Sequence, residues 1–441
     1  MLLIYPNTET SHIEAEELTA YIGCNIQIHG VIYKIRTMSG FAFVLLQTKR
    51  SLVQCVWAAE YSNFPLSKLK CNMAVIISGD VVAEERSRSG YELRIKNFTA
   101  LSNPFKEPPI VVNGRELNAS LDTLLDYRPI TLRNARERAI FKIQEGICRG
   151  FRAFLELNRF TEIHSPKIVY SGAEGGANIF TLDYFGKEAY LAQSPQFYKQ
   201  MMMGVYERVF EIAPVFRAEK HHTSRHVNEY TSVDLEMGFI KSFADIMALE
   251  TKMIIETLVY LKENYFEELE LLNVTVPEIT AIPSIPFDEA KALISKSYNR
   301  VITDFEDFEP EEERLLYEII KKQTGCDFVF VTHYKSSKRP FYAMDTKCNP
   351  EVTESFDLLF RGLEVTTGGQ RIHDYVRQVE KMHRREMNIA LFSSYLMAHQ
   401  YGLPPHGGLG LGLERFTARL LNLPNVRQAT LFPRDTERLE P

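Results

Sequence analysis

The sequence predicts an α+β protein in which a small N-terminal β-barrel precedes a larger domain built on a mostly antiparallel sheet. Three observations support this fold class. Five short β-type runs follow one another near the N-terminus, and a long amphipathic helical pattern begins near residue 130. The later strand-like runs alternate polar and apolar residues and show no regular strand–helix–strand repeat. With 441 residues, the chain is long enough for two or three domains with sizeable cores.

The predicted barrel occupies residues 1–102. Residues 1–20 are expected to form a short helical lead-in, and strands follow in the runs NIQIHGVIYKI, FAFVLLQ, SLVQCVWA, MAVIISGDVVAE and YELRIKNFTAL. Five strands in about 80 residues are typical of the oligonucleotide-binding fold (OB-fold), a barrel whose face and loops bind single-stranded nucleic acid. Residues 103–130 begin with the proline-rich NPFKEPP and are predicted to be a linker or hinge.

The larger domain is predicted to span residues 131–441. Its first helix places apolar residues at helical spacing from Ile140 to Phe154, and this wide apolar face suits either an internal core or an interface between two copies. Further helices are expected over 243–264 and 374–400. Strands are expected in the runs RVFEIAPVFRAE, TSVDLEMGFI, CDFVFVTHY and GLEVTTGGQRI.

Composition excludes several classes of protein. The formal charge of −6 argues against a protein that coats nucleic acid by bulk attraction, although it permits a local basic site. No run of 18 apolar residues is present, and the N-terminus lacks the basic segment of a secretion signal. The six scattered cysteines include no C-x-x-C pair, which argues against a disulfide framework and a zinc cluster. We therefore expect a cytoplasmic protein.

A charged loop between two predicted strands is the first candidate site. Arg217 and Glu219 stand at the end of one strand, and Arg225 and His226 lie in the loop before the next. Arginine offers the planar, bidentate geometry that suits phosphate and carboxylate groups. A solvated hairpin with surface charges fits the same pattern.

A glycine-rich run near the C-terminus, GGLGLGLER, is the second candidate. Its glycines let the backbone approach a ligand closely, and Arg415 follows Gly412 at the start of a helix. A dinucleotide-binding fingerprint would need a further strand–helix–strand unit, but 29 residues remain after Gly412 (441 − 412), and they include Pro424 and Pro433. Glycines that only allow close packing remain an alternative.

Two further segments place charged and polar groups together. Glu364 lies in a strand next to glycines and could hold Mg²⁺ together with substrate phosphates, but Thr367 shares its face only if the strand bulges. An ion pair between Glu364 and Arg371 is the alternative. Gln196 and Lys199, at i and i+3 of a predicted helix, could bind a small anion or could mark an exposed helix start.

Taken in order, these segments resemble the class II aminoacyl-tRNA synthetases, and within them the aspartyl-tRNA synthetases of the short archaeal and eukaryotic-like type. The resemblance runs from about residue 18 to the end. Motif 1 corresponds to FRAFLELNRFTEIHSPKIV, motif 2 to PVFRAEKHHTSRHVNEYTSVDLEMGF and motif 3 to GGLGLGLERF. The loop SGAEGG at 171–176 and the segments QSPQFYKQ, RPFY, FDLLFRG and GGQRIHDY also fit the aspartate branch.

The resemblance implies an ATP-dependent aspartate–tRNA ligase. Aspartate would attack the α-phosphate of ATP to give aspartyl-adenylate and pyrophosphate, and the 3′-hydroxyl of the tRNA would then take the aspartyl group. Positioning and neutralisation of phosphate charge suffice for this chemistry. The implied ATP contacts are Arg217, which would bridge the α-phosphate and the substrate carboxylate, Glu219 at adenine or the tRNA end, and Arg225 and His226 at the β- and γ-phosphates. Arg415 would lie over adenine and reach the γ-phosphate, and Gly412 would form the floor of the site.

The resemblance also implies the metal and amino-acid contacts. Glu364 and Thr367 would hold Mg²⁺, although the family often has Ser where this chain has Thr367. Lys199 and Arg371 would bind the side-chain carboxylate of aspartate, and Glu174 and Gln196 would receive its ammonium group. Asparagine would then leave two cations without an anionic partner, which is expected to exclude it.

The barrel is implied to read the tRNA anticodon through Arg36, Phe43 and Gln54, although core packing is an alternative for Phe43. One departure concerns Gly30-Val31-Ile32, where the family commonly has Gly-Trp-Val. In related archaeal enzymes this Trp position bears on the exclusion of tRNA(Asn), so we hypothesise that tRNA(Asn) is charged as well as tRNA(Asp).

Motif 1 implies a homodimer. Two alternatives to the aspartate enzyme stay open: an asparaginyl-tRNA synthetase, and a synthetase paralogue that acts as a tRNA- or amino-acid-binding regulator. Lys199 argues against the first, because asparaginyl enzymes generally lack the QSPQ-x-x-K helix. The presence of Arg217, Glu364 and Arg415 argues against the second.

Overall fold

The computed structural model describes residues 15–48, 52–87, 89–170, 172, 178–220 and 223–441. The chain divides into two compact units, residues 1–117 and 118–441. Every helix in the described ranges is too short or too polar to cross a membrane.

The first unit is a closed five-stranded barrel, as predicted. A 3₁₀ helix (Ala15–Tyr21) precedes the strands, which pair in the order β1-β2-β3-β5-β4. Their bounds are β1 Asn25–Thr37, β2 Phe41–Gln47, β3 Leu52–Ala58, β4 Ala74–Ala83 and β5 Tyr91–Ser102. Alternate apolar side chains point inward and form one core, for example Val44 and Leu46 of β2. A side chain at Gly30 would lie 2.5 Å from the carbonyl oxygen of Gln47, so close pairing of β1 with β2 requires glycine there.

The second unit is built on an eight-stranded sheet in the order β12-β13-β14-β15-β16-β11-β10-β6. Most neighbours are antiparallel, and the pairs β12–β13 and β6–β10 are parallel. The strands are β6 Thr161–Glu162, β10 Arg208–Phe216, β11 Glu229–Gly238, β12 Ser284–Pro286, β13 Phe328–Thr332, β14 Ser355–Phe360, β15 Glu364–Gln370 and β16 His406–Gly412. A separate small sheet contains β7 Ile168–Val169, β8 Thr181–Tyr184 and β9 Lys187–Leu191. The predicted α+β class is confirmed.

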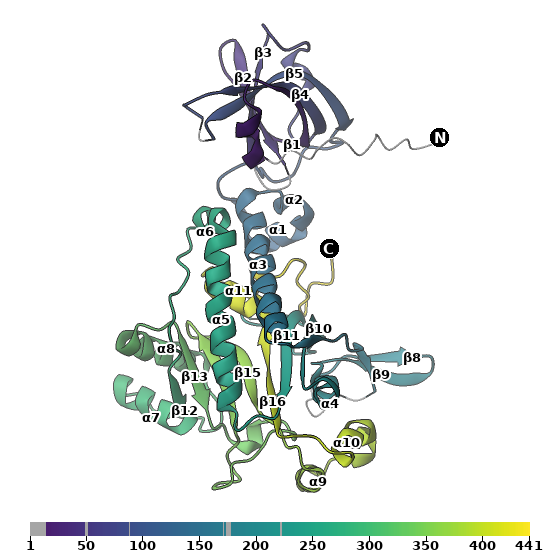
Figure 1. Ribbon diagram of the computed structural model, residues 1–441, viewed down its shortest axis with the longest axis vertical. Coiled ribbons are helices and arrows are strands. Elements are labelled where there is room, and N and C mark those ends of the chain that lie inside the picture. The colour runs from purple at the N-terminus through teal and green to yellow at the C-terminus, as the bar shows by residue number, and fades with distance from the viewer. Residues whose placement is uncertain (1–14, 49–51, 88, 171, 173–177, 221–222) are drawn as a thin grey trace. The chain divides into compact units, whose positions relative to one another are not determined.

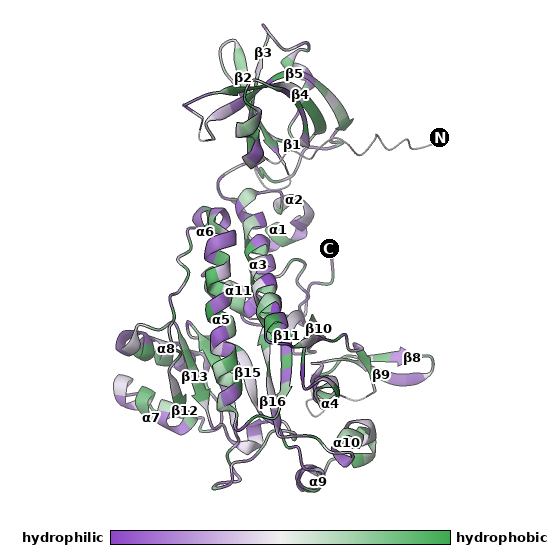
Figure 2. Ribbon diagram, in the orientation of Figure 1, coloured by the Kyte–Doolittle hydropathy of each residue, from purple (hydrophilic) through white to green (hydrophobic). Residues whose placement is uncertain are grey.

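Two long helices, α3 (Ala135–Leu157) and α5 (Ala244–Asn264), run side by side along the second unit (Figure 1). Both alternate hydrophobic and hydrophilic segments (Figure 2), and their apolar sides join the sheet in one core. They approach closely because Gly146 and Gly150 of α3 face Leu261 and Thr257 of α5. The other helices are α1 Leu121–Asp126, α2 Arg128–Thr131, α4 Gln196–Tyr206, α6 Phe266–Leu272, α7 Phe287–Tyr298, α8 Pro310–Thr324, α9 Tyr375–Arg384, α10 Ser393–Gln400 and α11 Leu413–Leu420.

Three details differ from or refine the sequence-based expectations. The apolar face from Ile140 to Phe154 packs into the core of its own unit, so it is internal rather than an exposed interface. The helix expected over 374–400 is two helices, α9 and α10, because the chain turns at Glu386 in the left-handed region (φ 55°). The stretch predicted as a linker, 103–130, contains α1 and most of α2.

Candidate active site

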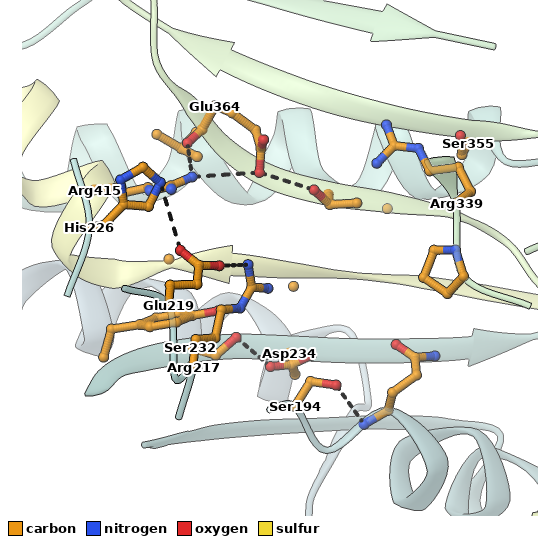
Figure 3. A pocket seen from close by; sticks show the side chains of 18 of the residues that line it. Ser194, Arg217, Glu219, His226, Ser232, Asp234, Arg339, Ser355, Glu364 and Arg415 are labelled. Carbon is orange, nitrogen blue, oxygen red and sulfur yellow. Dashed lines mark hydrogen bonds and ion pairs between the residues drawn. The ribbon is translucent and has the colours of Figure 1, made fainter. Parts of the chain in front are cut away.

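A pocket of about 330 Å³ opens on one face of the large sheet (Figure 3). Its walls come from α4, residues of the loop after β10, strand β11, the segment 338–343, strands β15 and β16, and the start of α11. The sequence-predicted residues that line it are Gln196, Lys199, Arg217, Glu219, Arg225, His226, Glu364, Thr367, Arg371, Gly412 and Arg415. Glu174, predicted to receive the ammonium group, lies outside the described residues.

The glycine-rich strand β16 forms part of the pocket floor. Gly408 and Gly410 pair across the sheet with Glu236 and Asp234 of β11. A β-carbon at Gly408 would lie 2.2 Å from a carboxylate oxygen of Glu236, and one at Gly410 would lie 3.1 Å from Asp234 Oδ1. The alternate glycines therefore leave room for acidic side chains that stand on the neighbouring strand.

Those two acids pair with the two cations predicted to bind aspartate. Lys199 Nζ donates to Asp234 Oδ1 at 2.7 Å and to the Leu409 carbonyl oxygen at 2.8 Å. Arg371 Nε donates to Glu236 Oε1 at 3.1 Å, and its Nη2 donates to the Gly408 carbonyl oxygen at 2.9 Å. All four side chains are buried. The group carries two positive and two negative charges, so its charges are balanced before any ligand binds.

On the other side of the pocket, a bulge in β15 brings Glu364 and Thr367 together, as their predicted joint role requires. Leu358 of β14 pairs with Thr366 and Leu359 with Glu364, which leaves Val365 as the extra residue. As a result, Thr367 Oγ1 donates to Glu364 Oε1 at 3.2 Å. The two side chains therefore face the same pocket.

Asp357 on β14 lies directly opposite Thr367. Its Oδ2 accepts from Arg339 at 2.7 Å, and its buried Oδ1 has no hydrogen-bond partner among the described residues. Burial raises the pKa of the Asp357 carboxyl to about 6, with Arg339 opposing and Glu364 adding to the shift. Burial also acts to raise the pKa of Glu364, but the cations Arg415, Arg339 and Arg217 outweigh it and hold that pKa below its ordinary value.

These oxygen atoms fit a hard cation. A carboxylate, a hydroxyl and an unpartnered buried carboxylate oxygen converge beside the pocket, and Mg²⁺ prefers such ligands. In the described ranges, no three or more His, Cys, Asp or Glu side chains gather as a complete metal cage. That agrees with the usual Mg²⁺ arrangement, in which one or two carboxylates act together with substrate phosphates.

The predicted loop after β10 presents its charges to the pocket. Arg217 and His226 approach Glu219 from two sides, at 3.9 Å each (Figure 3). The Asn228 side chain holds the loop by donating to the carbonyl oxygens of Arg217 and Glu219. The Arg217 guanidinium also lies over the Tyr230 ring, 5.6 Å from its centre. The loop is therefore shaped by its own contacts before a ligand binds.

Arg415 joins this loop to β15. It lies in the first turn of α11, donates to the Glu364 carbonyl oxygen at 3.1 Å, and approaches the Glu364 carboxylate at 3.6 Å. Its Nε also donates to the Arg225 carbonyl oxygen at 3.4 Å. The Arg225 side chain lines the pocket, but its Nη2 donates to the Glu313 carboxylate on α8.

In the barrel, the three predicted anticodon residues share one outward surface. Arg36 of β1 lies directly opposite Phe43 of β2, and Gln54 of β3 is diagonal to Phe43 because it pairs with Leu45. Phe43 is half-buried, lies outside the barrel core and contacts Phe41 edge to face at 5.2 Å. Core packing, the alternative for Phe43, is therefore not observed.

Sequence reasoning assigned no role to Asp234, Glu236, Asp357 or Arg339, which all stand in or beside this site. The sequence did contain a pattern that could have identified the three acidic residues. Asp234 and Glu236 occur at alternate positions of a buried strand, so they face one side together, and Asp357 is the charged residue of a fully buried strand.

Comparison with known proteins places this chain in a family. The family described as tRNA synthetases class II (D, K and N) matches residues 120–436. The aspartate–tRNA(Asp/Asn) ligases of Deinococcus radiodurans and Thermus thermophilus are each 43% identical, over 96% of this chain and 98% and 99% of theirs. The aspartate–tRNA(Asp) ligase of Pyrococcus abyssi is 37% identical over 98% of this chain and 99% of its own.

Solved structures of tRNA synthetases also resemble this chain. Asparaginyl-tRNA synthetase from Pyrococcus horikoshii, complexed with asparaginyl-adenylate, superposes with a TM-score of 0.90 at 29% identity, covering 98% of this chain and 100% of that one. The aspartyl-tRNA synthetase of Entamoeba histolytica gives a TM-score of 0.87 at 28% identity, covering 100% and 95%. The chain therefore belongs to the class II tRNA synthetases of the D, K and N group.

Proposed function

We propose that this protein is an aspartate–tRNA ligase that activates L-aspartate with ATP and transfers it to tRNA. The observation that carries the proposal is the pocket in which Lys199 and Arg371 present donors beside an arginine-rich surface. Full-length similarity to aspartate–tRNA ligases at 35–43% identity supports it. An asparaginyl enzyme and an inactive regulator are not favoured.

In the proposed reaction, the protein supplies position and charge and forms no covalent bond to substrate. Arg217 holds the α-phosphate against the aspartate carboxylate, and Glu219 contacts the adenine amino group or the tRNA end. His226 and Arg225 meet the β- and γ-phosphates, and Arg415 lies over adenine. Cations fixed around the phosphates stabilise the charge that develops during transfer.

Magnesium is proposed to bind Glu364 and Thr367, with Asp357 as a further oxygen ligand. When bound, Mg²⁺ would neutralise phosphate charge and orient the triphosphate. The protein's own contribution is the bulge in β15, which points both a carboxylate and a hydroxyl into the pocket.

The structure changes the explanation for aspartate selectivity. We expected asparagine to leave two unpaired cations, but Lys199 and Arg371 already have Asp234 and Glu236 as partners. The donors that remain on Lys199 and Arg371 offer hydrogens and no acceptor. A carboxylate can accept from both, whereas the amide nitrogen of asparagine would bring a donor to a donor. Selectivity is thus proposed to rest on unmatched hydrogen bonds, with Gln196 near the ammonium group.

The partners proposed are tRNA(Asp) and, as a second substrate, tRNA(Asn). Arg36, Phe43 and Gln54 supply a cation, a stacking ring and an amide on one barrel surface, which suits unpaired anticodon bases. Val31 replaces the family's Trp, and the two relatives at 43% identity are named as acting on both tRNAs.

We also propose a cytoplasmic homodimer. With the Ile140–Phe154 face internal, large apolar side chains still exposed in or beside motif 1 include Leu157, Ile168 and Tyr170. Exposed apolar side chains of this kind are candidates for a subunit interface. A mass twice that of the 50.8 kDa chain at micromolar concentration would support this proposal, and a monomer mass would reject it.

Pyrophosphate exchange into ATP tests activity and amino-acid identity together. We expect exchange with aspartate to exceed that with asparagine or lysine by at least about 100-fold, since a site built for one hydrogen-bonding pattern discriminates strongly. Exchange with asparagine instead would identify an asparaginyl enzyme. Exchange with none of the three would favour the regulator.

Charging assays test the second tRNA. We expect purified tRNA(Asp) and tRNA(Asn) both to accept aspartate. Changing Val31 to Trp restores the family's residue and is expected to lower charging of tRNA(Asn) relative to tRNA(Asp). If wild-type protein leaves tRNA(Asn) uncharged, the proposal of dual specificity is wrong while the aspartate activity stands.

A further inference from the structure

Arg225 is bound to a carboxylate outside the proposed triphosphate site. Its Nη2 donates to Glu313 Oε2 on α8 and lies 3.5 Å from the Gly362 carbonyl oxygen. Both side chains are largely buried, with 20% of Arg225 and 11% of Glu313 exposed. Arg225 still lines the pocket, so it has a carboxylate on one side and, when ATP binds, would have phosphates on the other.

The position of Glu313 is fixed by packing. Gly362, in the turn before Glu364, lies so close to α8 that a β-carbon there would be 2.9 Å from the Arg314 Cα. The neighbouring acids on α8 have other partners: Glu312 binds Lys291, and Glu311 binds Arg314. Glu313 is thus the acid of this helix turn that faces Arg225.

Electrostatics explain why Arg225 needs a counter-ion. Burial, together with the nearby cations Arg415 and Arg419, lowers the pKa of Arg225 to about 10, and Glu364 partly opposes this shift. Cations of like sign repel one another in a partly buried site, and an anion in direct contact offsets that repulsion. Glu313 supplies that anion when no polyphosphate is present.

We propose that Glu313 competes with the triphosphate of ATP for Arg225 and thereby sets the affinity of the site for ATP and pyrophosphate. This inference rests on the proposed function, because it takes the pocket as an ATP site. If Arg225 binds phosphate after it leaves Glu313, the apparent affinity is reduced by the fraction of molecules in which the Arg225–Glu313 pair is closed. Glu313 is then a positioning residue that acts through Arg225 and touches no substrate.

Replacing Glu313 with glutamine tests this competition, because the shape is retained while the charge is lost. In aspartate-dependent exchange we expect the KM for ATP to fall roughly fivefold, and inorganic pyrophosphate to inhibit at correspondingly lower concentration, as expected when a competing closed state is removed. The KM for aspartate should stay unchanged. The matched control is Glu311→Gln on the same helix, an exposed acid that pairs with Arg314, for which we expect no change in either KM.

A double-variant cycle shows whether the effect passes through Arg225. Arg225→Gln should raise the KM for ATP, and adding Glu313→Gln to it should have no further effect. An unchanged or raised KM in Glu313→Gln alone, or an equal fall in the Arg225→Gln background, overturns the inference. Absence of exchange in the wild-type protein would instead reject the proposed function, so the two failures are distinguishable.

Discussion

Replacing Lys199 with leucine is expected to abolish aspartate-dependent pyrophosphate exchange. Lys199 is 1% exposed and lines the pocket, and its ammonium group donates to Asp234 and to the Leu409 carbonyl oxygen. Leucine removes the donor for the substrate carboxylate. It also leaves Asp234 buried without its cation, and the loss of one partner of a buried pair costs about 3–5 kcal/mol.

Because that cost is large enough to unfold the protein, a second variant is needed that keeps the buried charges balanced. Lys199→Met combined with Asp234→Asn removes both charges, so thermal unfolding should return close to the wild-type temperature. Exchange with aspartate should remain absent in this double variant, since the Lys199 donor is gone and Arg371 alone is left to face the carboxylate. Wild-type-like exchange in either protein would remove Lys199 from the proposed amino-acid site. Exposed Lys252 provides the control, and Lys252→Leu should keep full activity.

Replacing Glu250 with glutamine is expected to stabilise the protein at alkaline pH. Glu250 lies on α5, is fully buried behind the sheet and has Thr366 near its carboxyl group. Burial raises the pKa of the Glu250 carboxyl from its ordinary value of 4.5 to about 8, with Thr366 opposing and Asp357 adding to the shift. Between these two values the folded state holds a proton that the unfolded state has lost, so stability falls as pH rises.

The expected size follows from the same shift. At pH 7.5, the raised pKa of Glu250 lowers the free energy of unfolding by roughly 3–4 kcal/mol. Glutamine avoids this loss because it carries no charge at any pH. Melting temperatures measured between pH 5 and pH 8.5 should therefore fall more steeply for the wild type than for Glu250→Gln. The control is Glu256→Gln, an exposed position on the same helix, which should follow the wild-type slope. Parallel curves for wild type and Glu250→Gln would contradict the prediction.

The sequence predicted the fold class and most of the pocket because local patterns carry that information. Alternation marked the barrel strands, and charges at strand ends marked Arg217 and Arg415. A joint role for Glu364 and Thr367 requires a twist or bulge near 365–367, and the structure has a bulge there, at Val365. Local patterns do not show which residues far apart in the sequence come into contact. The pairs Lys199–Asp234 and Arg225–Glu313 are therefore seen only in the folded chain.

The absence of long-range contacts from local sequence patterns also explains where the structure differs from the sequence-based expectations. An apolar helical face has one signature whether it packs on its own sheet or on another subunit, so the face from Ile140 to Phe154 could not be assigned beforehand. The break between α9 and α10 depends on a single left-handed residue, Glu386, which interrupts a pattern otherwise typical of one helix. Asp357 lies seven residues before Glu364, and only the pairing of β14 with β15 brings it beside the pocket that Glu364 lines.

The four balanced charges around Lys199 and Arg371 also constrain how such a pocket could evolve. A single substitution that removes the charge of Lys199, Arg371, Asp234 or Glu236 leaves one net charge buried, with the penalty described above. Any route from an acidic to a neutral amino-acid substrate must therefore change these residues in compensating pairs or pass through poorly folded intermediates. Selection for a stable fold would then slow the drift of amino-acid identity, even where the specificity for tRNA changes freely on the barrel.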